Sequence, residues 1–321
     1  MKTLYQIGSP SNIRLVRPSA MPNDSDRRLP QGDEIFLDHV GHFVRDPQAA
    51  SRALARAGFA PTPVSVQTDA SGQKTGTGNI TAMLERGYIE VLFKTADTEI
   101  GRELDASLVL HSGVHLAAFS VADAERAHAR LGAAGFKMRP LVKFSRPVET
   151  ETGSGVAAFT VVRVERGEMP EGRIQILRHE TEDTVWQKRW LDHPNGAVGL
   201  LDLVIVVANE VEATVRFAKF ADRGIGSNRF CSEVTLDRGR VELMPQQVYS
   251  ALLPEVRTPS LPFQGAYGIA VKSLDAASAI MRQGNLETRR LGRALIAGFP
   301  PELGVGAWVF VEQAADLPWR A

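Results

Sequence analysis

A strand, a capped helix and a histidine recur together in this 321-residue chain, and this repeat limits its fold more than any other feature. The phrases LDHV, with His39, and GVHL, with His115, lie 76 residues apart, and each precedes an amphipathic segment. Asp46 and Asp123 stand where helix N-caps are expected, and a glycine follows each last turn. The repeat predicts a duplicated strand–helix unit with His39 and His115 in equivalent places.

Two further copies of the unit lack the histidine. The segment 199–204 leads into a helix from about 209 to 222, so that Leu203 takes the place of His39. The segment 266–271 leads into a helix over 275–283, so that Gly268 takes the place of His115. Four units therefore predict an α+β fold, and only the first two carry histidines suited to a metal.

Hydrophobic alternation and turn residues place the remaining elements. We expect an extended N-terminal arm over 1–32, a first domain over 33–198 with the functional site, and a degenerate second domain over 199–321. The first domain is predicted to hold strands at 35–44, 61–68, 77–85, 87–94, 113–121, 137–145, 156–165 and 172–179.

Composition excludes several function classes. The 37 basic and 37 acidic residues cancel, which gives no electrostatic reason to expect nucleic acid or a membrane as a partner. No apolar stretch predicts a membrane span or a signal peptide. The single Cys231 fits a reducing compartment. We expect a cytoplasmic protein that acts on a small molecule, and a homodimer is the assembly to test for.

The tandem units resemble the vicinal oxygen chelate superfamily, which includes glyoxalase I, extradiol dioxygenases and bleomycin-resistance proteins. The strand-one phrase Asp38-His39-Val40 carries the resemblance, as do the segments TGNITAMLERGYIE over 77–90 and HPNG over 193–196, which are similar to the bacterial glyoxalase-like branch. The resemblance implies four tandem βαβββ units that form two eight-stranded, cup-shaped mixed sheets with helices outside.

In that superfamily a metal lies at the floor of the cup, held by the first and fourth strands of two units. Carried over by position, the implied ligands are His39, Glu90, His115 and Gln175. Two imidazoles, a carboxylate and an amide oxygen suit a divalent ion such as Zn, Ni, Mn or Fe. The neighbours of Glu90 and Gln175 in each strand are aliphatic, so the polar side chains are expected to face the cup.

Other candidates carry less weight. His179 shares the face of Gln175 and is predicted to contact substrate or transfer a proton beside Glu90. His42 lies three residues from His39 and is expected to have a structural role. In the second half Glu242 matches Glu90, but Leu203, Gly268 and Phe310 replace the other ligands, so the second cup is predicted to be free of metal.

These features favour a metal-dependent isomerase, lyase or hydrolase that moves a proton on a small oxygenated metabolite. Glu90 and His179 are its predicted catalytic residues. One alternative is an extradiol-type Fe(II) ring-cleaving dioxygenase, although Gln175 then stands where that group has a carboxylate. A non-catalytic binding or resistance protein is the second alternative.

Overall fold

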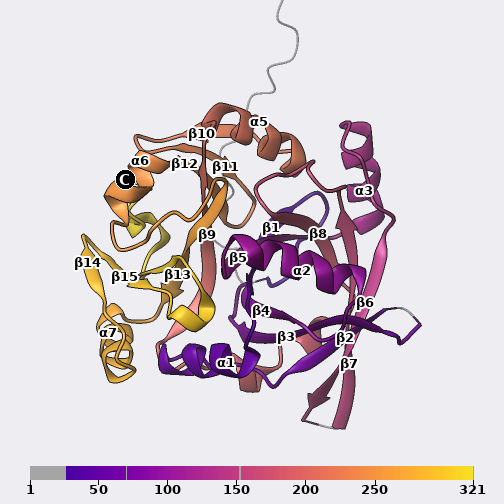
Figure 1. Ribbon diagram of the computed structural model, residues 1–321, viewed down its shortest axis with the longest axis horizontal. Coiled ribbons are helices and arrows are strands. Elements are labelled where there is room, and N and C mark those ends of the chain that lie inside the picture. Colours follow the sequence, from indigo (N-terminus) through magenta and orange to yellow (C-terminus); the bar gives the residue numbers. More distant parts are fainter. Residues whose placement is uncertain (1–26, 70, 152, 321) are drawn as a thin grey trace, which may run out of the picture.

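The chain forms four βαβββ units, as the repeat predicts (Figure 1). The computed structural model describes residues 27–69, 71–151 and 153–320. Most of the predicted arm, residues 1–26, lies outside the described residues. The first unit comprises β1 (Ile35–Phe43), α1 (Pro47–Arg56), β2 (Ser65–Asp69), β3 (Lys74–Met83) and β4 (Tyr88–Lys94). The second comprises β5 (Gly113–Val121), α3 (Ala124–Ala133), β6 (Val142–Thr150), β7 (Gly153–Arg163) and β8 (Arg173–His179).

The second half repeats this order with shorter strands. The third unit comprises β9 (Ala197–Val207), α5 (Glu210–Ala221), β10 (Ile225–Ser227), β11 (Ser232–Thr235) and β12 (Arg240–Pro245). The fourth comprises β13 (Phe263–Val271), α7 (Leu274–Gln283), β14 (Arg289–Leu291), β15 (Ala294–Gly298) and β16 (Ala307–Val311). Between units lie α2 (Glu99–Leu110), α4 (Glu182–Val185) and α6 (Gln246–Leu252).

The strands of the first half close into a barrel. Neighbours follow the order β1-β4-β3-β2-β6-β7-β8-β5, and an additional pairing of β5 with β1 completes the ring. The β1–β4 and β5–β8 pairs are parallel and the others are antiparallel. The second half joins through β13 but does not close, because in the described chain β10 and β14 each pair with one strand only. The predicted mixed sheets are thus confirmed, one as a closed barrel.

Side-chain caps fix where the main helices begin. Asp46 and Asp123 accept hydrogen bonds from the backbone at the starts of α1 and α3, and Asn209 and Ser273 do the same for α5 and α7. Helix α2 was not predicted, although Thr98 caps it in the same way. It packs Leu104 and Leu108 over one end of the barrel, so it helps to enclose the interior.

The pairing of β1 with β5 corrects the predicted equivalence of the two histidines. Val40 lies opposite Ala117 in this pairing. On one side of that pair His39 lies opposite Ala118, and on the other side Gly41 lies opposite Leu116. The rotation that exchanges the two units therefore maps His39 onto Leu116, not onto His115. A one-residue slip in a strand turns every side chain to the opposite face, so the difference matters for the site.

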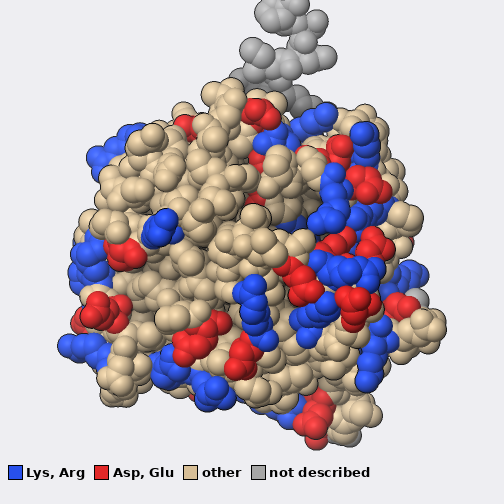
Figure 2. Space-filling model, in the orientation of Figure 1, with Lys and Arg blue, Asp and Glu red and all other residues tan. Residues whose placement is uncertain are grey.

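The surface offers no single-sign patch on the face shown in Figure 2. Basic and acidic side chains mingle there, most densely over the side that carries α2 and α3. Several form ion pairs, such as Arg139 and Arg173 with Glu103. Within the described residues no helix is long and apolar enough to span a membrane.

Candidate functional site

The barrel of the first half encloses a cavity of about 60 Å³. Apolar and polar side chains share its walls, and the polar ones include a cluster from β1, β3 and β4 as well as three arginines. The lining side chains of this barrel cavity include His39, Gln67, Asn79, Tyr88, Glu90, Leu92, Ile100, Leu116, Phe144, Arg146, Phe159, Val161, Arg163, Arg173, Gln175 and Leu177. Three of the four predicted ligands, His39, Glu90 and Gln175, thus meet in one cavity.

His39 is held by three neighbours. Its Nδ1–H donates to Asp38 Oδ1 at 2.8 Å, which leaves Nε2 as the ring atom that faces Glu90. The distance from His39 Nε2 to Glu90 Oε2 is 3.5 Å. The ring of Tyr88 stacks on the imidazole with centroids 4.3 Å apart. Asn79 Nδ2 donates to Glu90 Oε1 at 2.7 Å and fixes the carboxylate in turn.

Asp38 occupies a β-bulge in β1, where the register against β5 shifts between Leu37 and His39. Its side chain is fully buried, and its second oxygen accepts from His179 Nε2 at 2.9 Å. Burial raises the pKa of a carboxyl, but the imidazoles of His179 and His39 outweigh it and hold the pKa of Asp38 well below its usual range. Asp38 is therefore a buried anion that orients His39.

His179, a predicted catalytic residue, is not among the residues that line the barrel cavity. It packs behind Asp38 between Phe159 and Trp186. The structure thus gives it a positioning contact with Asp38 instead of the predicted contact with substrate.

His115 faces away from the barrel cavity, as the register of β1 and β5 requires. It is the extra residue in a bulge of β5, equivalent to Asp38 in β1. Its Nε2 hydrogen-bonds to the His111 carbonyl at 2.8 Å, and the two imidazoles lie 4.1 Å apart in a second cavity of about 310 Å³. Burial lowers the pKa of both rings. In the second unit the position equivalent to His39 is held by Leu116, which lines the barrel cavity but has no atom that could bind a metal.

The predicted four-ligand metal centre is therefore not assembled. One imidazole, one carboxylate and one amide converge, and the part of the chain that the structure describes holds no group of three or more His, Cys, Asp or Glu arranged for a metal ion. Three arginines line the same cavity. Arg173 is paired with Glu103, the other two make no ion pair among the described residues, and Glu90 is the one carboxylate of the lining. An excess of fixed positive charge opposes a divalent cation, so this donor set does not fit the metal that the resemblance implies.

One of these arginines, Arg146 on β6, has no obvious counter-ion. Its side chain is 8 % exposed, and its Nε has no hydrogen-bond partner among the described residues. Burial lowers its pKa, and the nearby Tyr88 and Glu90 partly offset that effect. Arg173 differs because Glu103 pairs with it at 2.9 Å. Sequence reasoning did not identify Arg146, since the contact of β6 with this cavity depends on tertiary pairing.

The second half retains a carboxylate pair at the matching positions. In the first unit His39 of β1 pairs with Tyr88, two residues before Glu90 in β4. In the third unit Asp202 of β9 pairs with Arg240, two residues before Glu242 in β12. Asp202, and not the predicted Leu203, is therefore equivalent to His39. Glu242 matches Glu90, as predicted. By the same register, Ala266 of the fourth unit corresponds to Leu116, and Val309 corresponds to Gln175. The residues predicted at these two positions, Gly268 and Phe310, were therefore wrong.

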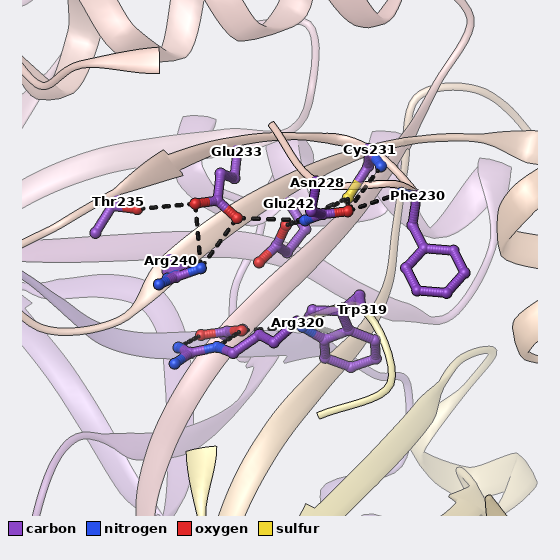
Figure 3. A network of polar contacts seen from close by, with 10 residues as sticks. Asn228, Phe230, Cys231, Glu233, Thr235, Arg240, Glu242, Trp319 and Arg320 are labelled. Atoms are coloured by element: carbon purple, nitrogen blue, oxygen red, sulfur yellow. Dashed lines mark hydrogen bonds and ion pairs between the residues drawn. The ribbon is translucent and has the colours of Figure 1, made fainter. Parts of the chain in front are cut away.

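The side chains of Trp319 and Arg320 lie in this second cup (Figure 3). Arg320 Nε donates to Asp202 at 2.7 Å, and Trp319 Nε1 donates to the same oxygen at 2.9 Å. Cys231 Sγ lies 3.2 Å from Glu242 Oε2 as a donor. Burial and the charge of Asp202 raise the pKa of Glu242 to about 8, so it is largely protonated at neutral pH. Asp202 and Glu242 are thus held by side chains of the second half itself.

Comparison with known families decides the classification. The profile of the glyoxalase-like domain matches residues 37–221, more than half of the chain. The chain belongs to the glyoxalase-like domain family. The match begins in β1 and ends in α5, so it covers the barrel and part of the third unit. A search of curated proteins finds no match.

Solved structures share the fold of this glyoxalase-like protein at low sequence identity. A hypothetical protein from Staphylococcus aureus has a TM-score of 0.61 and 11% identity, with 86% of this chain and 98% of that chain covered. A mutant of 4-hydroxymandelate synthase from Streptomyces coelicolor has a TM-score of 0.51 and 13% identity, with 86% and 92% covered. A Mn(II)-bound glyoxalase from Novosphingobium aromaticivorans has a TM-score of 0.50 and 14% identity, with 88% and 83% covered. At these identities the likenesses show that the chain shares its fold with these proteins.

Proposed function

We propose that this glyoxalase-like protein is an enzyme that transfers a proton on a small oxygenated metabolite held in the barrel cavity. The observation that carries the proposal is the approach of His39 Nε2 to Glu90 Oε2, 3.5 Å apart, at one side of a cavity lined by both apolar and polar side chains. Buried acid–base groups that face each other in such a cavity are typical of general acid–base sites.

The neighbours of the pair prepare it for this chemistry. Asp38 accepts the Nδ1 proton of His39 and so directs Nε2 at Glu90 and the cavity. Glu90 is anchored by Asn79, so that its other oxygen stays beside the imidazole. A proton taken from a carbon next to a carbonyl can then be held by the His39–Glu90 pair and returned to a neighbouring atom.

The enolate that forms needs positive charge near its oxygen. Arg173 lines the cavity with 19% of its side chain exposed, and the loss of hydration lowers its pKa to about 10. It remains a cation at neutral pH and is fixed by Glu103 before substrate arrives. Preorganised charge of this kind stabilises a developing oxyanion more effectively than water does. The reaction classes that this arrangement supports are isomerisation and elimination, without a metal.

Exchange of carbon-bound hydrogen for deuterium tests the proposal. The protein is incubated in D₂O with a panel of 2-oxo acids, hydroxyketones and 2-oxoaldehyde adducts, with and without EDTA, and NMR follows the loss of C–H signals. We expect exchange that survives EDTA and falls at least about 100-fold in Glu90→Gln and in His39→Gln. Glu242→Gln, at the equivalent position of the filled cup, serves as the matched control and should retain the rate.

Two results would contradict the proposal. Equal losses in Glu90→Gln and Glu242→Gln would show that the barrel cavity is not the site. Turnover of a catechol that needs both Fe²⁺ and oxygen would favour the dioxygenase alternative.

A further inference from the structure

Arg146 is a buried cation that nothing described in the protein neutralises by contact. Its side chain is 8 % exposed, and it lines the barrel cavity together with Phe144 and Phe159. None of the hydrogen bonds or ion pairs of the described residues involves its guanidinium group, and its Nε is buried without a partner. A guanidinium carries five N–H donors, and the one on the buried Nε is left unpaired at a cost in free energy.

The surroundings of Arg146 distinguish it from the other arginines of the barrel cavity. Arg173 pairs with Glu103 at 2.9 Å, which accounts for its burial. Arg163 also has a buried Nε without a partner among the described residues, but the residue is only half-buried and its guanidinium lies over the ring of Phe144, 5.8 Å from the centroid. Glu90 acts on Arg146 electrostatically but makes no ion pair with it, since its carboxylate is held by Asn79 and faces His39. The cavity therefore presents a guanidinium fork and no carboxylate that meets it.

We infer that Arg146 binds the carboxylate of the substrate, so that the substrate class is a small carboxylic acid with an apolar body. A carboxylate is planar and accepts two parallel N–H bonds from a guanidinium, which satisfies the unpaired donors. The walls of Leu92, Leu116 and Leu177 suit an aliphatic chain. A phosphate dianion would need more donors than one free fork supplies.

The reaction that the bound acid would undergo rests on the proposed function. The binding of the acid depends only on Arg146. The carboxylate at Arg146 places the rest of the acid within the small cavity, which also holds the His39–Glu90 pair. The proton to be moved is then one on the carbon chain of the bound acid, and no further group is consumed. Binding and proton transfer are therefore separable by experiment.

Titration with a matched pair of ligands tests the inference. Isovalerate and isovaleramide have the same shape and differ in charge, and NMR titration of the full-length protein measures both affinities. We expect isovalerate to bind at least about 10-fold more tightly than isovaleramide. Arg146→Gln should abolish that preference, and Arg146→Lys should restore part of it. Arg178→Gln is the control, because Arg178 lies on β8 with 45% of its side chain exposed.

Thermal unfolding of each variant separates loss of binding from loss of fold. Glu90→Gln should keep or tighten isovalerate binding while it loses deuterium exchange, so failure of the proposed function leaves the binding result intact. Equal affinities for acid and amide in the wild-type protein would overturn the inference, as would a preference that persists in Arg146→Gln. Tighter binding of inorganic phosphate than of isovalerate would overturn it as well.

Discussion

His42 shows how a single side chain in β1 joins the two halves of the molecule. Its Nδ1–H donates to the Leu303 carbonyl at 2.9 Å, and its Nε2 accepts from the Tyr267 hydroxyl at 2.8 Å. Trp308 Nε1 donates to the same hydroxyl oxygen at 2.7 Å. Each group has its partner only while the imidazole is neutral, since a protonated Nε2 no longer accepts. The structural role predicted for His42 is thereby confirmed.

This network predicts a loss of stability in mild acid. Burial lowers the pKa of His42 from 6.5 to about 4, with a smaller contribution from nearby His115. Between these values the unfolded chain binds a proton that the folded chain does not, so the free energy of unfolding falls as pH drops from 6.5 through 4. The contribution of His42 is about 3 kcal/mol. Urea unfolding of the wild-type protein at several pH values measures it.

A variant isolates the part that belongs to His42. His42→Asn should be less stable than the wild type at pH 7, because its hydrogen bonds are lost, but its stability should fall less on acidification. His111 and His115 also have pKa values lowered by burial, and their contribution remains in both proteins. Identical slopes in the two proteins would show that another group titrates.

Three residues of the barrel cavity, His39, Glu90 and Gln175, were predicted from the sequence, but the register that relates the two units was predicted one residue out. Aligning the chain on His39 and His115 assumes an offset of 76, whereas the caps Asp46 and Asp123 are 77 residues apart. The caps give the true offset, because a helix start is fixed by hydrogen bonds while a histidine is free to occur on either face of a strand. The same one-residue error explains why Leu203, and not Asp202, was predicted as the equivalent of His39.

At the scale of elements, the four copies of the unit were predictable from periodicity and caps, and the closure of the barrel was not. Closure depends on the pairings of β2 with β6 and β1 with β5, which join segments far apart in the sequence. The role of Arg146 follows from one of these pairings. Local patterns specify elements, and only tertiary pairing brings their side chains together.

The turn between β3 and β4 supports the site directly and yields a prediction. Gly87 has φ +76°, and a Cβ at this position would lie 2.6 Å from the Asp38 carbonyl oxygen. Gly87→Ala should therefore lower the free energy of unfolding by at least about 2 kcal/mol, since the strain of positive φ adds to a backbone clash. It should also slow proton transfer, because Tyr88 and His39 shift with Asp38.

Gly167 provides the matched control for this change. It has φ +87°, but a Cβ there would meet no atom within 4 Å. Gly167→Ala should thus show the backbone strain alone, about 1 kcal/mol, with activity retained. Urea unfolding of both variants compares the two costs, and equal costs would contradict the proposed clash.

At the scale of the whole molecule, the two halves share one hydrophobic core. Phe217 and Phe220 of α5 pack against Phe119 of β5, and Phe220 also contacts Phe136. Helices α1 and α7 meet so closely that a Cβ on Gly284 would lie 2.0 Å from a carbonyl oxygen of α1. The largest cluster of buried apolar side chains thus runs across the division predicted at residues 198 and 199, while three smaller clusters each lie within one half.

A shared core predicts that the halves unfold together. The full chain should show a single transition in urea with the same midpoint by circular dichroism and by tryptophan fluorescence. A fragment of residues 33–198 would expose the apolar faces of β1, β5 and α3 that the second half covers, and would leave His42 without Tyr267 and Leu303. It should bind a hydrophobic dye and lack a cooperative transition. A fragment that unfolds cooperatively and retains deuterium exchange would show instead that the first barrel is an independent domain.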